Sequence, residues 1–191
     1  MKYILVILIT IILAPFNYAQ NILEEKPSKT ENQSHFGNTQ EYVNNLAGEI
    51  FLLPKQTQKL PDFKTLTPVG KIYTNQLNIH KQPFYKGFPG VTKRFEYFAI
   101  QYKGNFYVPE PCNMCFSLKS DDGSKLFIND ALVINNDSLH VFRGKENCIR
   151  LPKGLQKIEV QYFQGPLDLG LILQYKFEKE EKYKLFDLVE F

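Results

Sequence analysis

The stretch that decides the fold runs from Cys115 to Ile128 and reads CFSLKSDDGSKLFI. Apolar and polar residues alternate on both sides of its centre, as they do in strands with one face toward a core and one toward water. At the centre lie two adjacent carboxylates, Asp121 and Asp122. Neighbouring carboxylates raise each other's pKa unless a cation, amide N–H groups or solvent relieves the repulsion. The pair therefore indicates either a calcium site or a well-solvated turn.

The simpler of these two interpretations is a turn that connects the strands of a hairpin. Aspartate side chains accept backbone N–H bonds in such turns, and Gly123 would supply a positive φ. Isolated aspartate pairs at turns are usually only turns, so the residues alone favour this interpretation over calcium.

The chain from Gly48 onward consists of short β-branched and aromatic runs separated by Gly, Pro, Asn and Asp. The alternation is cleanest in Gln156–Tyr162, and no convincing helix lies between the runs. We expect an all-β fold, an antiparallel β-sandwich or a jelly-roll-like barrel. The candidate strands are Glu49–Leu53, Gly70–Ile79, Phe95–Val108, Met114–Lys119, Lys125–Ile128, Ala131–Ile134, Asn147–Leu151, Gln156–Tyr162, Leu169–Lys176 and Tyr183–Leu188.

The N-terminal segment has the features of a secretory signal peptide. Lys2 precedes an apolar run, Ile4–Phe16, and a small residue, Ala19, precedes a polar start. No second run of about twenty apolar residues follows, so we expect no membrane span after cleavage. The expected location is secreted, periplasmic or on the outer cell surface. We divide the chain into a signal peptide (1–19), a polar linker or disordered arm (20–45), a β-sandwich domain (46–176) and a C-terminal extension (177–191).

Removal of residues 1–19 leaves 172 of the 191 residues, with 22 basic and 20 acidic side chains and a net charge of +2. The basic residues are dispersed, so we expect no nucleic-acid partner. A chain of this length suits one domain with its own core.

The three cysteines predict one disulfide in an exported chain. Cys112 and Cys115 form a single C-x-x-C without a second such motif, and the three histidines lie far apart in sequence, so zinc is disfavoured. We expect Cys148 to pair with either Cys112 or Cys115, which leaves one thiol free; a direct bridge between Cys112 and Cys115 would close a very small loop.

No catalytic constellation is present in the sequence, and we expect no enzyme. A Gly-x-Ser-x-Gly elbow is missing. Adjacent carboxylates such as Asp121 and Asp122 cannot flank a glycosidic bond as a hydrolase requires.

Four blocks carry a specific resemblance, which covers roughly three quarters of the mature chain. In order, they are Gly87–Ile100, Phe116–Ile128, Leu132–His140 and Leu155–Pro166. The chain resembles the protective-antigen-type, fourteen-kilodalton carbohydrate-binding β-sandwich (the PA-fourteen domain), a family that includes yeast flocculin adhesins and inserts in bacterial glycosidases. The first block and the ending of the last are similar to the version common in secreted and envelope proteins of Bacteroidota-type bacteria.

The resemblance implies a binding module whose site lies at the aspartate pair. In flocculin-type members, two consecutive aspartates joined by a cis peptide bond hold a calcium ion that coordinates sugar hydroxyls. The matching positions are Asp121 and Asp122. The family's pattern places further ligands in the loop with Asp168 and in a second loop. The residues of the second loop, taken as ligand-binding, are Asn135, Asn136, Asp137 and His140.

The resemblance thus implies calcium-dependent binding of a glycan or other hydroxylated ligand, with adhesion as its role. The chain has no tryptophan to serve as an aromatic sugar platform, although tyrosine can take that part. For His140, a ring that is hydrogen-bonded within the turn is more common than a functional histidine. The alternative function is a structural or docking subunit with an envelope protein partner, attached through residues 20–45 and 177–191.

Overall fold

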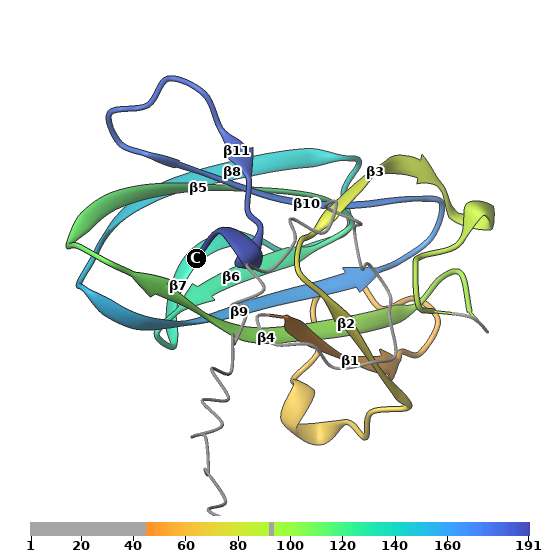
Figure 1. Ribbon diagram of the computed structural model, residues 1–191. Helices are drawn as coiled ribbons and strands as arrows, with labels where there is room; N and C mark the ends of the chain where they lie inside the picture. The colour runs from red at the N-terminus through yellow and green to blue at the C-terminus, as the bar shows by residue number, and fades with distance from the viewer. Residues whose placement is uncertain (1–44, 92–93) are drawn as a thin grey trace, which may run out of the picture. The chain divides into compact units, whose positions relative to one another are not determined.

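The computed structural model describes residues 45–91 and 94–191. The predicted signal peptide and all but the last residue of the predicted arm lie outside these ranges. The described residues form an all-β fold of two antiparallel sheets stacked as a sandwich, which confirms the expected fold class (Figure 1). Within these residues the two sheets stay open and do not close into a barrel. No helix in these ranges is long and apolar enough to cross a membrane.

One sheet has six strands in the order β2-β1-β4-β9-β6-β7, and the other has five. In the second sheet the order is β11-β10-β5-β8, and β3 also pairs with β10. The strands of the first sheet are β1 (Leu46–Leu52), β2 (Gly70–Thr74), β4 (Phe98–Val108), β6 (Ser124–Ile128), β7 (Ala131–Asn136) and β9 (Gly154–Gln164). Those of the second are β3 (Asn78–Pro83), β5 (Cys112–Asp121), β8 (Arg143–Leu151), β10 (Asp168–Phe177) and β11 (Lys184–Leu185). Three short 3-10 helices are η1 (Phe63–Thr65), η2 (Phe84–Lys86) and η3 (Leu188–Glu190).

The core lies between the two sheets and follows from the alternation in the sequence. In β9 the side chains of Ile158, Val160 and Tyr162 are buried, whereas Glu159 and Gln161 between them are partly exposed on the outer face. Phe116 on β5 is fully buried in the same core. Burial of one such side chain stabilises the fold by roughly 1.5–3 kcal/mol.

The segment Gly70–Ile79, expected as one strand, forms two strands that belong to different sheets. The break falls at Asn75, whose side-chain amide donates to Asp187 Oδ1 at 2.8 Å. Thr74 next to it donates its hydroxyl to the carbonyl of Gln76 at 2.6 Å. These polar bonds replace ladder pairing and let the chain cross from one sheet to the other.

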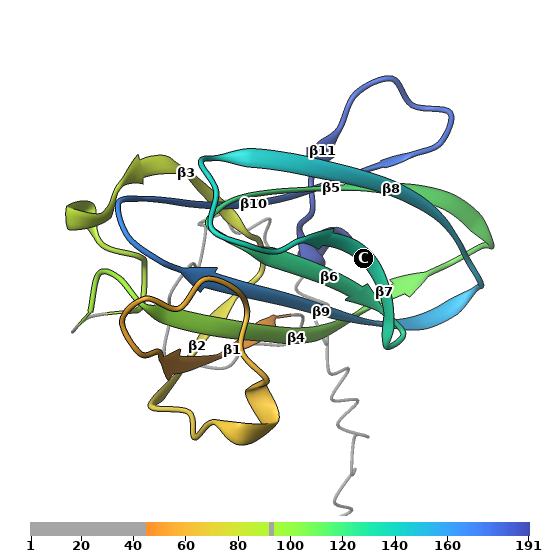
Figure 2. The same cartoon turned by 180° about the vertical axis from the view of Figure 1, so that it is seen from behind.

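The expected hairpin turn at Asp121 and Asp122 is also corrected by the structure. The strands on either side, β5 and β6, lie in different sheets, so the aspartates occupy a crossing between sheets (Figures 1 and 2). Gly123 does not supply a positive φ there. It is required for space, because a Cβ at this position would overlap the ring of Phe163 and lie 2.8 Å from Asp137 Oδ1.

The C-terminal segment, expected as an extension, contributes to the core. Phe186 and Leu188 are almost completely buried. Phe191 stacks on Phe186, with ring centroids 5.0 Å apart, and Phe106 on β4 contacts both rings edge-on. Residues after Phe177 therefore close one end of the sandwich.

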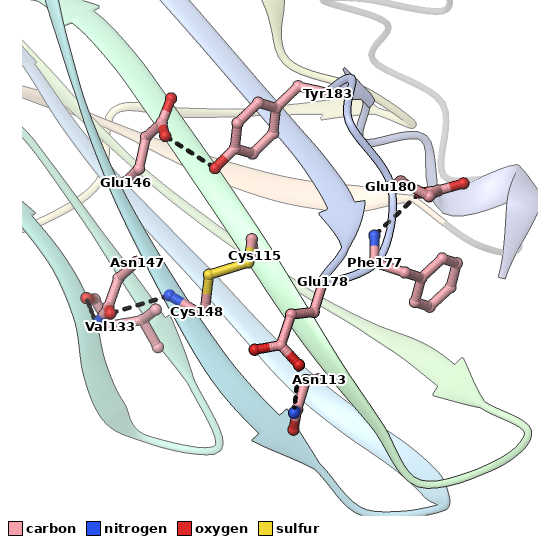
Figure 3. Close-up of a disulfide and its surroundings, with 10 residues drawn as sticks. All are labelled: Asn113, Cys115, Val133, Glu146, Asn147, Cys148, Phe177, Glu178, Glu180 and Tyr183. Carbon is pink, nitrogen blue, oxygen red and sulfur yellow. Dashed lines mark hydrogen bonds between the residues drawn. A yellow bond between two sulfur atoms is a disulfide. The ribbon is translucent and has the colours of Figure 1, made fainter.

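The disulfide joins Cys115 on β5 to Cys148 on β8 and leaves Cys112 free, which is one of the two pairings that the sequence left open. The two residues lie directly opposite each other in the β5–β8 register. Figure 3 shows this bridge with two polar contacts beside it, from the Tyr183 hydroxyl to Glu146 and from the Asn113 amide to Glu178. The contacts hold the C-terminal segment against the disulfide-bonded strands.

Candidate functional site

The aspartate pair opens onto a cavity of about 300 Å³ at the end of the sandwich. Asp121 ends β5, Asp122 begins the crossing, and the peptide bond between them is cis, the geometry that the resemblance implies. Asp168 and His140 also line the cavity. Four of the seven residues predicted as ligands thus lie around one space. The rest of the lining is apolar: Leu139, Val141, Pro166 and Leu167.

Asp122 ties the two loops of the cavity to the end of β5. Its Oδ1 accepts the backbone N–H of His140 at 3.1 Å, and its Oδ2 accepts the backbone N–H of Gly165 at 2.8 Å. Burial raises the pKa of the Asp122 carboxyl, and the two amide bonds offset part of that rise. Glycine at position 165 lets the backbone approach the carboxylate, because a Cβ there would lie 2.9 Å from Asp122 Oδ2 and 2.5 Å from Leu139 Cδ2.

Asp121 carries the more perturbed carboxyl of the pair. Burial and, next, the negative charge of Asp122 raise the pKa of Asp121 to about 6, although the backbone N–H of Phe142 lowers it in part. The charge of Asp168 raises it further, and that of Lys81 lowers it. Two carboxylates therefore share a partly buried space in which their repulsion is not fully relieved.

Asp168, the first residue of β10, forms an ion pair with a lysine side chain. Its Oδ2 forms an ion pair with Lys81 Nζ at 3.1 Å, in which both side chains are about half exposed. In residues 45–91 and 94–191, no three His, Cys, Asp or Glu side chains are placed to hold one metal ion. The three aspartates therefore line the cavity without converging on a single point, and the role of Asp168 as a metal ligand stays a prediction.

Asn136 lies outside the cavity lining and is fully buried. Its Nδ2 donates to Ser120 Oγ at 3.1 Å and to the carbonyl of Arg143 at 3.3 Å, while its Oδ1 accepts from Arg143 Nε at 3.1 Å. This network ties the end of β7 to β5 and β8.

Asp137 and Asn135 also direct their side chains to protein partners. Asp137 Oδ1 accepts the N–H groups of Leu60 and Ser138, and its Oδ2 pairs with Lys125 Nζ at 3.0 Å. Asn135 Oδ1 accepts the N–H of Asp137 at 3.1 Å. A ligand-binding role for these residues and Asn136 stays a prediction, since their side chains stabilise the loops in this structure.

His140 contacts two carbonyl oxygens of its own turn at the edge of the cavity. Its Nε2 lies 2.8 Å from the carbonyl oxygen of Asn136, and its Nδ1 lies 2.9 Å from that of Val141. The ring therefore fixes the loop, and its backbone N–H orients Asp122.

The sequence interpretation missed two features of the site: the apolar residues around the cavity, which we call the apolar rim, and Lys81, which pairs with Asp168. Val141 and Leu167 are 74% and 69% exposed. Leu167 has a φ of 73°, which is rare for such a residue, and its N–H donates to Glu96 Oε1 at 3.0 Å. In the sequence, Leu139 and Val141, the apolar residues on either side of His140, could have indicated this rim. The sequence contains no sign of the role of Lys81, because β3 and β10 are far apart in the chain and pair only in the folded structure.

A two-sheet sandwich with an aspartate pair at a sheet crossing and a cavity beside it has the architecture of a ligand-binding β-module. The chain belongs to the PA14 domain family, whose model matches residues 56–184. No curated protein matches the chain.

Solved structures share this fold at low sequence identity. The PA14 domain of the antifreeze protein MpAFP is 16% identical, with a TM-score of 0.64 over 78% of this chain and 92% of that chain. A PA14 sugar-binding domain from an RTX adhesin is 13% identical, with a TM-score of 0.64 over 78% and 97%. The A domain of epithelial adhesin 9 from Candida glabrata, in complex with Galβ1-4GlcNAc, is 13% identical, with a TM-score of 0.55 over 80% and 92%. At these identities the likeness establishes the fold.

Proposed function

We propose that this chain is an exported, non-catalytic module that binds a carbohydrate or another hydroxylated ligand at the cavity beside Asp121 and Asp122, with the help of calcium. The observation that carries the proposal is the pair of partly buried carboxylates, one with its pKa raised to about 6, that lines an open cavity. Family membership supports it, as do the sugar-binding RTX adhesin domain and the Candida glabrata adhesin domain among its structural neighbours.

The residues present fit a calcium ion in charge and in donor type. Calcium prefers about six to eight hard oxygen ligands, and the two carboxylates offer up to four. Among residues 45–91 and 94–191, each Asp122 oxygen accepts one amide N–H and keeps a lone pair for a further bond. Bound calcium would neutralise the pair and offer open coordination positions to ligand hydroxyls. The carboxylates are adjacent in sequence and cannot flank a scissile glycosidic bond, which supports a binding role over hydrolysis.

The apolar rim supplies the second half of a sugar site. Sites for small ligands combine apolar walls with a few placed polar groups. Val141 and Leu167 would contact the C–H face of a ligand whose hydroxyls point toward the aspartates. The same exposed rim also favours the second candidate, a docking subunit of an envelope complex, because exposed apolar side chains mark protein contacts as well.

Calorimetry and a glycan array separate the two candidates. We expect the protein to bind about one calcium ion per chain, Asp122→Asn to lose that heat, and a set of array signals to vanish both in EDTA and in Asp122→Asn. Glu181→Gln is the control, since Glu181 is exposed and does not line the cavity. If the wild-type protein shows no calcium heat and no change in melting temperature, the calcium site is refuted. Calcium binding with a silent array favours docking.

A further inference from the structure

A second cavity, of about 650 Å³, lies on the outer face of the six-stranded sheet. It shares no lining residue with the cavity at the aspartate pair. In Figure 1, the segment with η1 (yellow) lies on the side of this sheet that faces away from β5, β8 and β10. We call this second cavity the outer groove; its floor is the sheet and its wall is the segment 54–69.

Side chains of four neighbouring strands form the floor. Gln101 on β4 lies opposite Glu49 on β1 and Gln161 on β9. In the next row, Glu159 on β9 lies opposite Lys103 on β4 and Phe127 on β6. Opposite residues in antiparallel strands hold their Cβ atoms about 5 Å apart, so both rows are continuous surfaces.

The wall is held in place by a small apolar cluster of its own. Phe63 of η1 packs edge-on against Phe51 of β1, with ring centroids 5.1 Å apart, and Leu60 is buried beside them. The N–H of Leu60 donates to Asp137 Oδ1 at 2.8 Å, and that of Val69 donates to the carbonyl of Ile50 at 2.8 Å. Hydrogen bonds therefore fix the wall segment to the rest of the fold at two separate points, Leu60 and Val69.

A carboxylate oriented by two amides lies at the centre of the floor. Glu159 Oε1 accepts from Gln101 Nε2 at 2.8 Å and from Gln161 Nε2 at 2.6 Å. Within the described part of the chain, Glu159 Oε2 and the carbonyl oxygens of both glutamines have no hydrogen-bond partner. These three acceptor oxygens belong to residues that line the groove together with Lys103 and the half-buried Phe127.

We propose that the outer groove is a second carbohydrate site that takes a neutral oligosaccharide without calcium. Hydroxyl groups both donate and accept, which matches planar acceptors next to an ammonium group, and a sugar's C–H face can lie on Phe127. Four acidic residues of the lining against two lysines disfavour an anionic glycan. An extended peptide would need a free strand edge, and the floor strands β1, β4, β9 and β6 are paired on both sides.

The site adds a function to that of the aspartate pair and does not depend on it. Two sites on one chain would raise avidity for a glycan-covered surface, because the second contact becomes intramolecular. EDTA separates the two sites, since the proposed binding at the outer groove does not use calcium.

An array of neutral and acidic oligosaccharides, probed with the exported protein in EDTA, tests the proposal. We expect binding to neutral oligosaccharides that Glu159→Ala and Gln101→Ala each weaken about tenfold or more, with unchanged melting temperatures. Asp122→Asn and Glu146→Ala should leave it unchanged; Glu146 lies on β8 of the other sheet and is exposed. Absence of binding in EDTA, preference for acidic glycans or peptides, or full binding by Glu159→Ala would overturn the proposal. Calcium-dependent signals that persist in Glu159→Ala concern only the aspartate pair.

Discussion

The raised pKa of Asp121 makes the stability of the calcium-free protein depend on pH. The folded chain holds the Asp121 proton up to a pKa of about 6, against an ordinary value of 3.8. Because the folded pKa is the higher one, the protonated carboxyl contributes stability that is fully present below about pH 4 and is lost as pH rises through 6. A difference of about two pKa units corresponds to at most about 3 kcal/mol.

The variant Asp121→Asn removes this dependence while keeping an oxygen that can accept the N–H of Phe142. At pH 7 without calcium we expect the variant to be more stable than the wild-type protein by up to about 3 kcal/mol, or about 6–12 °C in melting temperature. Below pH 4 the two proteins should be equally stable. Urea unfolding in EDTA between pH 4 and 8 measures the difference directly.

Calcium should reverse the order of the two proteins. The ion neutralises the carboxylates that destabilise the wild-type fold, so saturating calcium at pH 7 raises the melting temperature of the wild type and not that of Asp121→Asn. Below about pH 6 the calcium affinity should fall as the proton competes for the carboxyl. Parallel pH profiles for wild type and variant would refute the claim that Asp121 carries an unrelieved charge.

Three further predictions concern the frame of the site. Gly165→Ala places a methyl group against Asp122 Oδ2; we expect a loss of about 1–3 kcal/mol in urea unfolding, and unchanged stability would contradict the tight contact. Cys148→Ser, in a Cys112→Ser background, opens a bridge between residues 33 positions apart and should cost about 4 kcal/mol, and a loss below 1 kcal/mol would show that the bridge adds little. Lys81→Gln frees Asp168 from its ion pair and should tighten calcium binding in calorimetry, while an unchanged affinity would exclude Asp168 from the site.

The layered fold could be predicted because its signal is local. Alternation in Gln156–Tyr162 appears on the two faces of β9, where Ile158 and Val160 point into the core. The single strand expected at Gly70–Ile79 was wrong for a non-local reason. The polar residues Thr74–Gln76 at the break do not exclude a strand by themselves, and the bond that fixes the break joins Asn75 to Asp187, which is distant in sequence.

The site could be predicted only as far as the chain itself brings residues together. The aspartate pair is contiguous, and Asp168 lies on β10, the strand that pairs with β5. The loop of Asn136 and Asp137 was expected to supply ligands, yet both side chains bond to protein groups on other segments, Asp137 to Leu60 and Asn136 to Ser120 and Arg143. Such partners give no pattern in a single sequence.

The place of the aspartate pair in the fold, more than its sequence, creates the unrelieved charge. In a hairpin turn both carboxylates would face water, where repulsion between neighbours is weak. At a crossing between sheets they are enclosed by the loops of His140 and Gly165, and only 4% of each aspartate residue's area is exposed. Gly123 and Gly165 allow this enclosure, since any side chain at either position would overlap its neighbours. The fold thus retains two neighbouring acidic groups beside a cavity, where a cation would stabilise them, and this supports a binding role over a purely structural one.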